Sequence, residues 1–307
     1  MRKRSQGSMH GWLIIDKPAG ITSAAVVGAV RRLTNASKAG HGGTLDPMAT
    51  GVLPVALGEA TKTVAYVVEG LKTYRFTVRW GEQRDTDDAD GVVIRESAYR
   101  PSVEEIEAAL PRFTGDIQQV PPRFSAVKIA GQRAYALARA EQTVDLPARP
   151  ARIEAFRFVA KPDADHAVFE VVSGKGVYMR SLARDLAIAL GTCGHVKDLR
   201  RLAVGPFAEA AAISLEQLKA RCEAGDLQGC LLSVGVALAG MPALSLTEAE
   251  ARRLQHGRPI AVLPVATRSA LRTIDRDGVF CAVAWGRPVA LAKVHGGEIR
   301  PLRILNL

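Results

Sequence analysis

A glycine-rich segment near the amino terminus, Gly40 to Gly51, holds the residues best suited to chemistry. Four glycines, a histidine and a carboxylate fall within these twelve residues, so the segment must turn tightly. The carboxylate, Asp46, could be catalytic, because the glycines around it would let another backbone, such as that of a ligand, approach closely. It is followed by Pro47, and an Asp-Pro pair is also typical of a plain turn. The residues alone leave both interpretations open.

Several other chemistries are excluded by spacing. No Gly-Lys-Ser/Thr follows the glycines and no G-x-G-x-x-G lies between a strand and a helix, so the segment is not a phosphate-cradling loop. The chain also lacks the G-x-S-x-G motif of serine hydrolases. Its four cysteines form no C-x-x-C pair and its six histidines show no ligand spacing, so we expect neither a metal site nor a disulfide framework.

The strands and helices that must position this segment are interleaved irregularly. Gly11 to Ile15 is typical of a short buried strand, and Thr22 is expected to cap the helix that follows. Tyr74 to Trp80 alternates apolar with polar residues, which indicates a half-buried strand. Val168 to Val172 predicts another strand, and the helix after it is expected to end at Gly191.

Two capping boxes, Ser102 with Glu105 and Ser214 with Gln217, mark further helices. After residue 242 the pattern changes to a brief helix at 247–255 and then short strands around 274, at 278–284 and at 289–294. Because the strands alternate rather than run fully apolar, we expect an α+β fold. Its core is a mixed, largely antiparallel sheet, and a small all-β module forms its C-terminal end.

The surplus of positive charge is confined to two segments. The chain has 41 Lys and Arg against 31 Asp and Glu, a net charge of +10. Residues 123–161 carry eight basic and three acidic residues, residues 243–307 carry ten and five, and the remainder is balanced. A neutral body with two basic segments suits a nucleic-acid binder, although a solvated basic face explains the charge count equally well.

The composition is that of a folded, water-soluble protein. Hydrophobic residues make up 48% of the 307 residues, and no apolar stretch approaches the roughly 20 residues needed to cross a bilayer. Residues 1–10 form a basic head with no apolar region behind it, so they are not a secretory signal. We expect a cytoplasmic protein of two domains with a flexible head.

Beyond these patterns, the glycine-rich segment resembles a known catalytic motif. Residues 40–62, GHGGTLDPMATGVLPVALGEATK, closely resemble GHTGTLDPxATGxLPxxxGxATK of the TruB family of tRNA pseudouridine synthases. Further family motifs are matched in the same order by Ile15–Gly20, Lys72–Arg75, Asp85–Gly91, Gly176–Leu182 and Leu199–Gly205. The chain departs from the family at Gly42, Gly174 and Val177, which stand at or near positions usually held by Thr, Ser and Thr.

The resemblance implies an architecture and a reaction. Residues 11–240 would form the pseudouridine synthase domain, with 123–161 as a basic insertion over the RNA, and 243–307 a PUA-type RNA-binding domain. The implied reaction breaks the N-glycosidic bond of uridine 55 in the T-loop of tRNA, turns the uracil over and rejoins it through carbon. Such an isomerisation implies no cofactor, no metal and no protein partner, and we expect a monomer.

The resemblance assigns three residues to catalysis. Asp46 would be the essential carboxylate, which either attacks the sugar or assists elimination. Arg180 would pair with it, because an adjacent cation stabilises the charged form of a carboxylate. Tyr74 would stack on the uracil and help to remove the proton from its carbon 5. Without the resemblance, Arg180 could be an exposed helix arginine and Tyr74 a core aromatic residue.

Five more residues are assigned to substrate binding by the resemblance. His41 would fill the gap left when the target base flips out of the RNA stack. Tyr178 and Leu199 would line the uracil pocket, with core packing as the alternative for both. Lys62 and Asp88 complete the set, and a helix-capping or turn role is the alternative for each.

A second class of function stays open. The chain could be a tRNA-binding folding factor, an RNA chaperone with weak or lost catalysis, because the basic segments suit either function. The two classes differ at Asp46 and Arg180, since a pure binding protein has no use for a carboxylate–arginine pair beside a base pocket.

Overall fold

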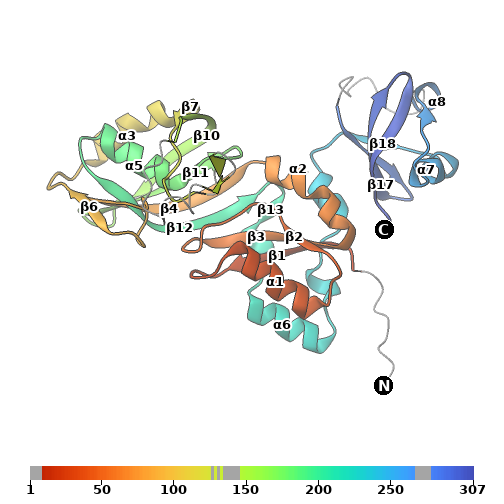
Figure 1. Ribbon diagram of the computed structural model, residues 1–307, viewed down its shortest axis with the longest axis horizontal. Coiled ribbons are helices and arrows are strands. Elements are labelled where there is room, and N and C mark those ends of the chain that lie inside the picture. Colours follow the sequence, from red (N-terminus) through yellow and green to blue (C-terminus); the bar gives the residue numbers. More distant parts are fainter. Residues whose placement is uncertain (1–8, 126–127, 130–131, 134–145, 267–277) are drawn as a thin grey trace.

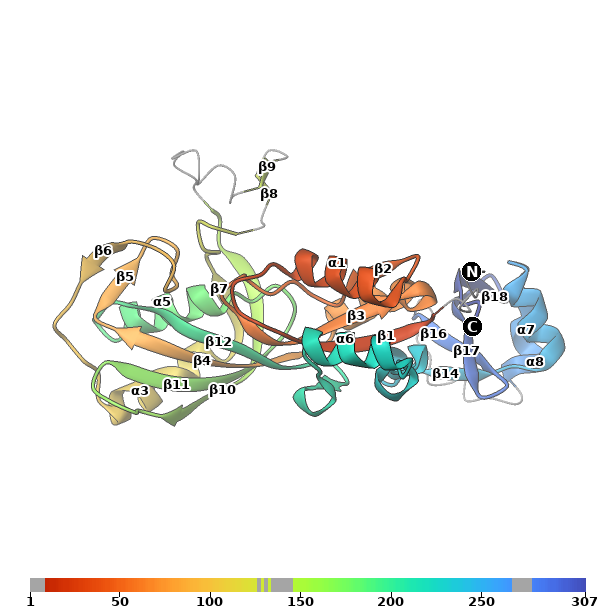
Figure 2. The same ribbon diagram turned by 90° about the horizontal axis from the view of Figure 1, so that it is seen from below.

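The computed structural model describes residues 9–125, 128–129, 132–133, 146–266 and 278–307, and within them the chain forms a large sheet and a smaller C-terminal sheet (Figure 1). Figure 2 shows the C-terminal sheet at one end of an elongated molecule and the hairpin of β5 (Glu82–Arg84) and β6 (Val93–Glu96) at the other. No helix in these described ranges is long and apolar enough to span a bilayer.

The large sheet has nine strands and is antiparallel except at one place. Its main order is β1-β3-β12-β4-β11-β10-β7, with β2 paired to β3 and β13 paired to β12. β3 and β12 run parallel where Thr50 faces Arg200 and Gly51 faces Arg201. The predicted mixed, largely antiparallel sheet is therefore confirmed. The strands are β1 (Gly11–Lys17), β2 (Ala39–His41), β3 (Thr50–Leu57), β4 (Lys72–Trp80), β7 (Gly115–Gln119), β10 (Arg149–Ala160), β11 (His166–Ser173), β12 (Gly194–Val204) and β13 (Phe207–Ala208).

The alternation predicted for β4 places its apolar side chains in the main core. Phe76 and Trp80 are buried, and the Phe76 ring stacks on Phe169 of β11 with centroids 5.6 Å apart. Helices α3 (Val103–Ala109) and α5 (Met179–Ala189) contribute apolar residues to the same cluster. This core supports the strand and the helix that carry Tyr74 and Arg180.

Two further helices, α1 (Ser23–Thr34) and α6 (Leu215–Ala224), lie side by side next to β1 (Figure 1). The predicted cap of α1 is confirmed, because the Thr22 hydroxyl accepts the Ala25 N–H at 3.1 Å. Both predicted capping boxes are present as well, before α3 and before α6. Helix starts were thus readable from local sequence.

The remaining elements of the first 240 residues are short connectors. They are η1 (Gly58–Thr63), α2 (Val64–Glu69), η2 (Leu110–Phe113), β8 (Lys128–Ile129), β9 (Gln132–Arg133), η3 (Glu209–Ala211), η4 (Gln228–Cys230) and η5 (Val234–Leu238). Residues 126–127, 130–131 and 134–145 of the expected insertion over the RNA lie outside the described residues, as do residues 1–8 of the expected head.

The C-terminal sheet has the strand order β14-β16-β17-β18-β15. The predicted helix at 247–255 is confirmed as α7, and a turn with positive φ at Trp285 (+53°) and Gly286 (+72°) joins β16 to β17. The strand expected around residue 274 lies outside the described residues. The elements are β14 (Ala243–Ser245), α7 (Glu248–Gln255), β15 (Ile260–Ala261), α8 (Val262–Ala266), β16 (Phe280–Ala284), β17 (Arg287–His295) and β18 (Glu298–Ile304).

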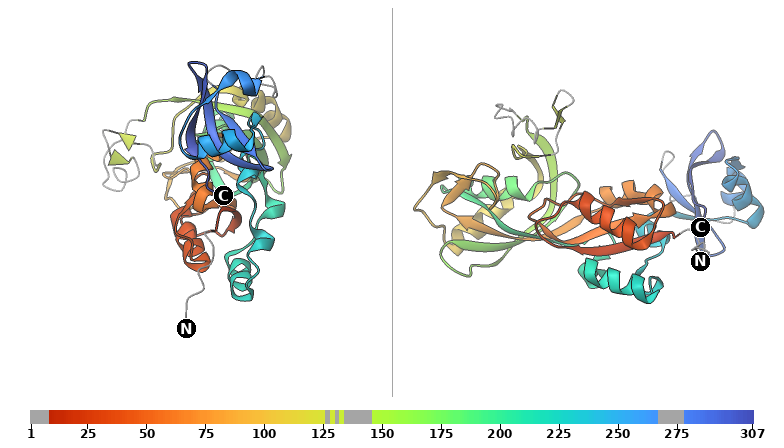
Figure 3. Two further views of the ribbon diagram at one scale, coloured as in Figure 1. Left: turned by 90° about the vertical axis from the view of Figure 1, so that its right-hand side faces the viewer. Right: turned by 60° about the horizontal axis from the view of Figure 1, so that its bottom comes forward.

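One hydrophobic cluster joins the two sheets. It contains Trp12 and Val52 of the large sheet together with Cys281, Leu291 and Leu305 of the C-terminal segment. Figure 3 shows this C-terminal segment in blue, against the end of the large sheet. Removing residues 243–307 would therefore expose part of the core of the large sheet, although the C-terminal sheet also has a hydrophobic cluster of its own.

Candidate active site

The loop that carries Asp46, between β2 and β3, is supported by a buried lysine. Lys17, at the end of β1, is 0% exposed, and its ammonium donates to the carbonyl oxygens of Pro47 at 3.0 Å and Ala49 at 2.6 Å. Burial lowers the pKa of Lys17 to about 8, and the negative charge of Asp46 acts in the opposite direction. Lys17 therefore fixes the backbone directly after Asp46.

A second buried cation fixes the backbone before Asp46. Arg201 of β12 is 1% exposed, and its guanidinium donates to the carbonyl oxygens of Val52 at 2.8 Å and Gly43 at 3.0 Å. β12 can come this close because Gly51 has no side chain. A Cβ on Gly51 would lie 2.2 Å from the carbonyl oxygen of Arg201, and the φ of Gly51 is +99°.

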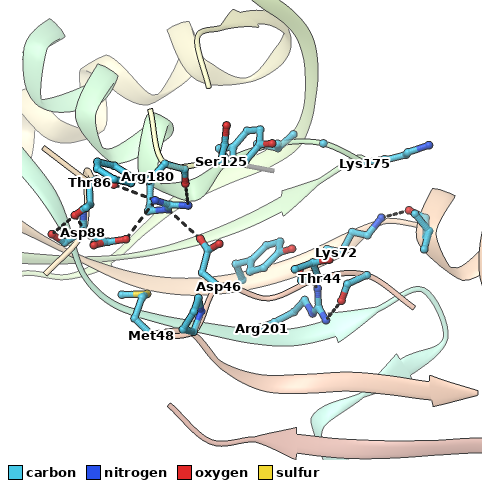
Figure 4. A pocket seen from close by; sticks show the side chains of 18 of the residues that line it. Thr44, Asp46, Met48, Lys72, Thr86, Asp88, Ser125, Lys175, Arg180 and Arg201 are labelled. Carbon is cyan, nitrogen blue, oxygen red and sulfur yellow. Dashed lines mark hydrogen bonds and ion pairs between the residues drawn. The ribbon is translucent and has the colours of Figure 1, made fainter. Parts of the chain in front are cut away.

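Asp46 forms an ion pair with Arg180 of α5, as the resemblance implied (Figure 4). Arg180 Nε lies 2.9 Å from Asp46 Oδ2, and Arg180 Nη1 lies 3.3 Å from Asp88 Oδ2. The guanidinium also donates to the carbonyl oxygens of Thr86 and Phe124, each at 3.0 Å. The Arg180 side chain is 6% exposed and that of Asp46 is 34% exposed. The carboxylate thus faces solvent while the cation that neutralises it is buried.

Asp46 lines a cleft of about 760 Å³, a size that suits a small ligand such as a nucleoside.

Tyr178, at the start of α5, is held by Gln119. The N–H of Tyr178 donates to Gln119 Oε1 at 2.8 Å, and the carbonyl oxygen of Tyr178 accepts from Gln119 Nε2 at 3.1 Å. Burial raises the pKa of the Tyr178 phenol, which is therefore neutral at physiological pH. Five of the eight predicted site residues line this cleft: Asp46, Tyr74, Asp88, Tyr178 and Arg180.

Two predicted site residues lie beside the cleft rather than in its lining. His41 ends β2 and is half-buried, and its pKa is lowered by burial and then by the charge of Arg201, so the imidazole is uncharged at neutral pH. Leu199 of β12 is 7% exposed and belongs to the same hydrophobic cluster as Leu45 and Phe76. The position of Leu199 therefore fits the alternative of core packing.

Lys62 lies at the contact between η1 and the C-terminal strand. Its ammonium is 2.6 Å from the Glu59 carboxylate and donates to the carbonyl oxygen of Ile304 at 2.7 Å. Glu59 in turn accepts the N–H of Asn306 at 2.8 Å. Lys62 therefore joins the two sheets in this structure and is not brought together with Asp46.

Four cations of the site received no role from the sequence. Lys72, Lys175 and Arg201 line the cleft, and Lys17 supports its floor. Each of them stands within or directly beside one of the matched motifs. The sequence signal that could have identified them is the presence of basic residues in the matched motifs without an assigned role. The sequence cannot show that several of these residues are buried.

The three departures from the family motif fit their surroundings differently. A Cβ on Gly42 would lie 2.6 Å from Cγ1 of Val67, so this glycine is packed tightly. A Cβ on Gly174 would meet Arg152 at 3.5 Å, which is an ordinary contact. Val177 is partly buried against the main core.

The comparisons with known proteins show the family of the chain. Residues 31–179 match the TruB family pseudouridylate synthase N-terminal domain, and residues 180–239 match the tRNA pseudouridylate synthase B C-terminal domain. The fold is thus that of a pseudouridylate synthase. The chain is 54% identical to tRNA pseudouridine synthase B of Rhodospirillum rubrum, covering 100% of this chain and 99% of that protein, and 53% identical to that of Gluconacetobacter diazotrophicus, covering 99% and 100%. The chain therefore belongs to the TruB family.

Solved structures share the fold. A Cbf5–Nop10–Gar1 complex contains a chain that matches with a TM-score of 0.76 at 25% identity, over 96% of this chain and 84% of that chain. A structure of an H/ACA RNP bound to a substrate RNA containing 2'-deoxyuridine matches with a TM-score of 0.74 at 22% identity, over 97% and 85%. These solved structures therefore share the α+β architecture of this chain.

Proposed function

We propose that this protein isomerises uridine to pseudouridine at position 55 in the T-loop of tRNA. The observation that carries the proposal is the ion pair between Asp46 and Arg180, which presents the Asp46 carboxylate to a cleft large enough for a nucleoside. Full-length relatives that are named tRNA pseudouridine synthase B support the same reaction.

Asp46 is the group that acts on the sugar. The reaction breaks the bond between N1 of uracil and C1′ of the ribose and forms a bond between C5 and C1′. Overall, C5 loses a proton and N1 gains one, so that atoms and charge balance without a cofactor. An ionised carboxylate beside C1′ either attacks that carbon or assists elimination. The buried Arg180 holds the carboxylate in place while leaving part of it exposed to the substrate.

The aromatic residues of the cleft hold the base. Tyr74 and Tyr178 both line the cleft together with Asp46. Tyr74 stacks on the uracil and helps to remove the C5 proton, and Tyr178 closes the cleft near α5. His41 fills the gap that the flipped base leaves in the RNA, a role that suits an uncharged imidazole beside the loop. Leu199 supports the base pocket from the core.

The remaining assignments follow from charge and resemblance. Residues 123–161 close over the T-arm, and residues 243–307 form a PUA-type module that contacts the RNA away from the flipped base, because these segments carry the positive surplus. The protein acts in the cytoplasm as a monomer. Lys62 contributes to RNA binding through the placement of the C-terminal module.

The direct test is incubation of the purified protein with an unmodified T-arm stem-loop, followed by detection of pseudouridine in the digested RNA by mass spectrometry. We expect one pseudouridine per RNA, at the position of uridine 55. A stem-loop with cytidine at that position is the matched control and should remain unmodified. Absence of pseudouridine at saturating protein would overturn the proposal, and tight binding without turnover would favour the folding factor instead.

A further inference from the structure

The cleft has two electrostatically different ends. One end holds Asp46 and Asp88 around the buried Arg180. The other end is lined by Lys72, Lys175 and Arg201, which Figure 4 shows on the opposite side of Asp46 from Asp88. We call these three residues the basic end of the cleft. The chemistry at Asp46 does not use them.

Two cations of the basic end are buried, and neither forms an ion pair with a carboxylate of the described residues. Arg201 is 1% exposed and Lys72 is 6% exposed. Arg201 donates to main-chain carbonyl oxygens, and the Lys72 ammonium does the same to Val68 and to Gly70, at 2.6 Å to Gly70. Among the described residues, no carboxylate lies within salt-bridge distance of either cation. Buried cations with neutral partners are costly, and an anion beside them relieves that cost.

The charges of the basic end act on one another. Burial, followed by the positive charges of Arg201 and Lys175, lowers the pKa of Lys72 to about 8, against the opposing charge of Glu69. Like charges that repel one another in the free protein are stabilised together when an anion enters. The basic end therefore has the electrostatics of an anion site.

The backbone at this end leaves room for a ligand. Gly176 has a φ of +83°, and nothing lies within 4 Å of the position that a Cβ would take there. Lys175 precedes it and is 56% exposed, so its ammonium can move toward an incoming group. Its present partner is Glu69, 63% exposed, at 2.5 Å.

We propose that the basic end binds a phosphodiester group adjacent to the target uridine. This inference rests on the proposed function, because a nucleotide in the cleft has a neutral base and sugar and carries its charge on its phosphates. With the sugar at Asp46, the phosphate is repelled by Asp46 and Asp88 and attracted to Lys72, Lys175 and Arg201. In the free protein, Glu69 forms an ion pair with the Lys175 ammonium. Glu69 would therefore compete with the phosphate for Lys175.

This competition predicts effects of opposite sign for the two members of one ion pair. Lys175→Gln removes a phosphate partner, so the RNA should bind about tenfold more weakly, with a slope of log K against log salt that is shallower by roughly 0.7. Glu69→Gln removes the competitor, so the RNA should bind severalfold more tightly. An ion pair that served only folding would give changes of the same sign for both variants, or none.

The experiment measures equilibrium binding of the pseudouridine-containing T-arm stem-loop, the stable product, to wild type and both variants. Lys219→Gln and Glu223→Gln are the matched controls, because this exposed pair on α6, 3.9 Å apart, lies outside the cleft lining. Two further RNAs carry a single neutral methylphosphonate, one on the 5′ side and one on the 3′ side of the target nucleotide.

For wild type, one of the two neutral linkages should weaken RNA binding about as much as the substitution Lys175→Gln does. The same linkage should weaken RNA binding to the Lys175→Gln variant only slightly, because that variant has already lost the contact. The position that shows this coupling identifies the phosphate. Equal behaviour of Lys175→Gln and Lys219→Gln, or full additivity at both linkages, would overturn the inference. Pseudouridine formation by the same wild-type preparation on unmodified RNA separates this failure from a failure of the proposed function.

Discussion

Gly42 and Val67 fit together as a small-to-large pair. Gly42 stands where the family usually has threonine, and the space that its missing side chain leaves is filled by Val67 of α2, whose Cγ1 would lie 2.6 Å from a Cβ at position 42. The N–H of Gly42 donates to the carbonyl oxygen of Pro54 at 2.8 Å. The loop next to His41 is therefore closely packed despite its glycine.

This complementarity predicts the behaviour of a double variant. Gly42→Ala should lower the free energy of unfolding by about 1 to 3 kcal/mol, because the new methyl group collides with Val67. Val67→Ala should lower it by about 1 to 2 kcal/mol through loss of buried volume. Combined, the two changes should cost clearly less than their sum in denaturant unfolding. Additive effects would show that the two side chains do not compete for one space.

Asp46→Asn should separate chemistry from binding. The amide keeps the shape of the side chain and removes the charge that acts on the sugar, so turnover should fall by several orders of magnitude. Folding and tRNA affinity should stay close to those of wild type, because Asp46 is 34% exposed and its loop is held by Lys17 and Arg201. Single-turnover rates with saturating RNA provide the measurement. Retention of a tenth of the wild-type rate would contradict the role given to Asp46.

Stability should depend on alkaline pH through Lys17. The pKa of Lys17 is about 8 in the folded protein and 10.5 for an ordinary lysine, so between these values the unfolded chain binds more protons than the folded one. The free energy of unfolding of wild type, relative to Lys17→Met, should therefore rise as pH increases from about 8 to about 10.5. Denaturant unfolding of both proteins at several pH values measures this difference. A difference that is constant or falls over this range would be inconsistent with a lowered pKa.

Activity should survive exhaustive treatment with a chelator. The proposed isomerisation needs no Lewis acid, and in the described part of the chain no three His, Cys, Asp or Glu side chains gather into a metal-binding group. A prefolded T-arm stem-loop is the proper substrate, since magnesium also acts through tRNA folding. Loss of turnover on that RNA, restored by zinc, would refute the prediction.

Local sequence was sufficient for much of the fold. Thr22 and the two capping boxes marked helix starts because a cap depends on residues only three apart, and the alternation in β4 marked a half-buried strand because side chains of a strand alternate between its faces. The motif around Asp46 indicated the family because its residue types and spacing are local as well.

Tertiary structure decided which charges meet and which are buried. Arg180 reaches Asp46, and Arg201 reaches the backbone of Gly43, because the sheet places α5 and the parallel pair β3 and β12 beside one loop. The motif that ends in Lys62 could not show that this lysine faces Ile304, far away in the chain. Periodicity and spacing report on neighbours along the chain, whereas the pairing of distant strands depends on how the whole core packs. The division of the cleft into an acidic and a basic end is therefore a property of the fold.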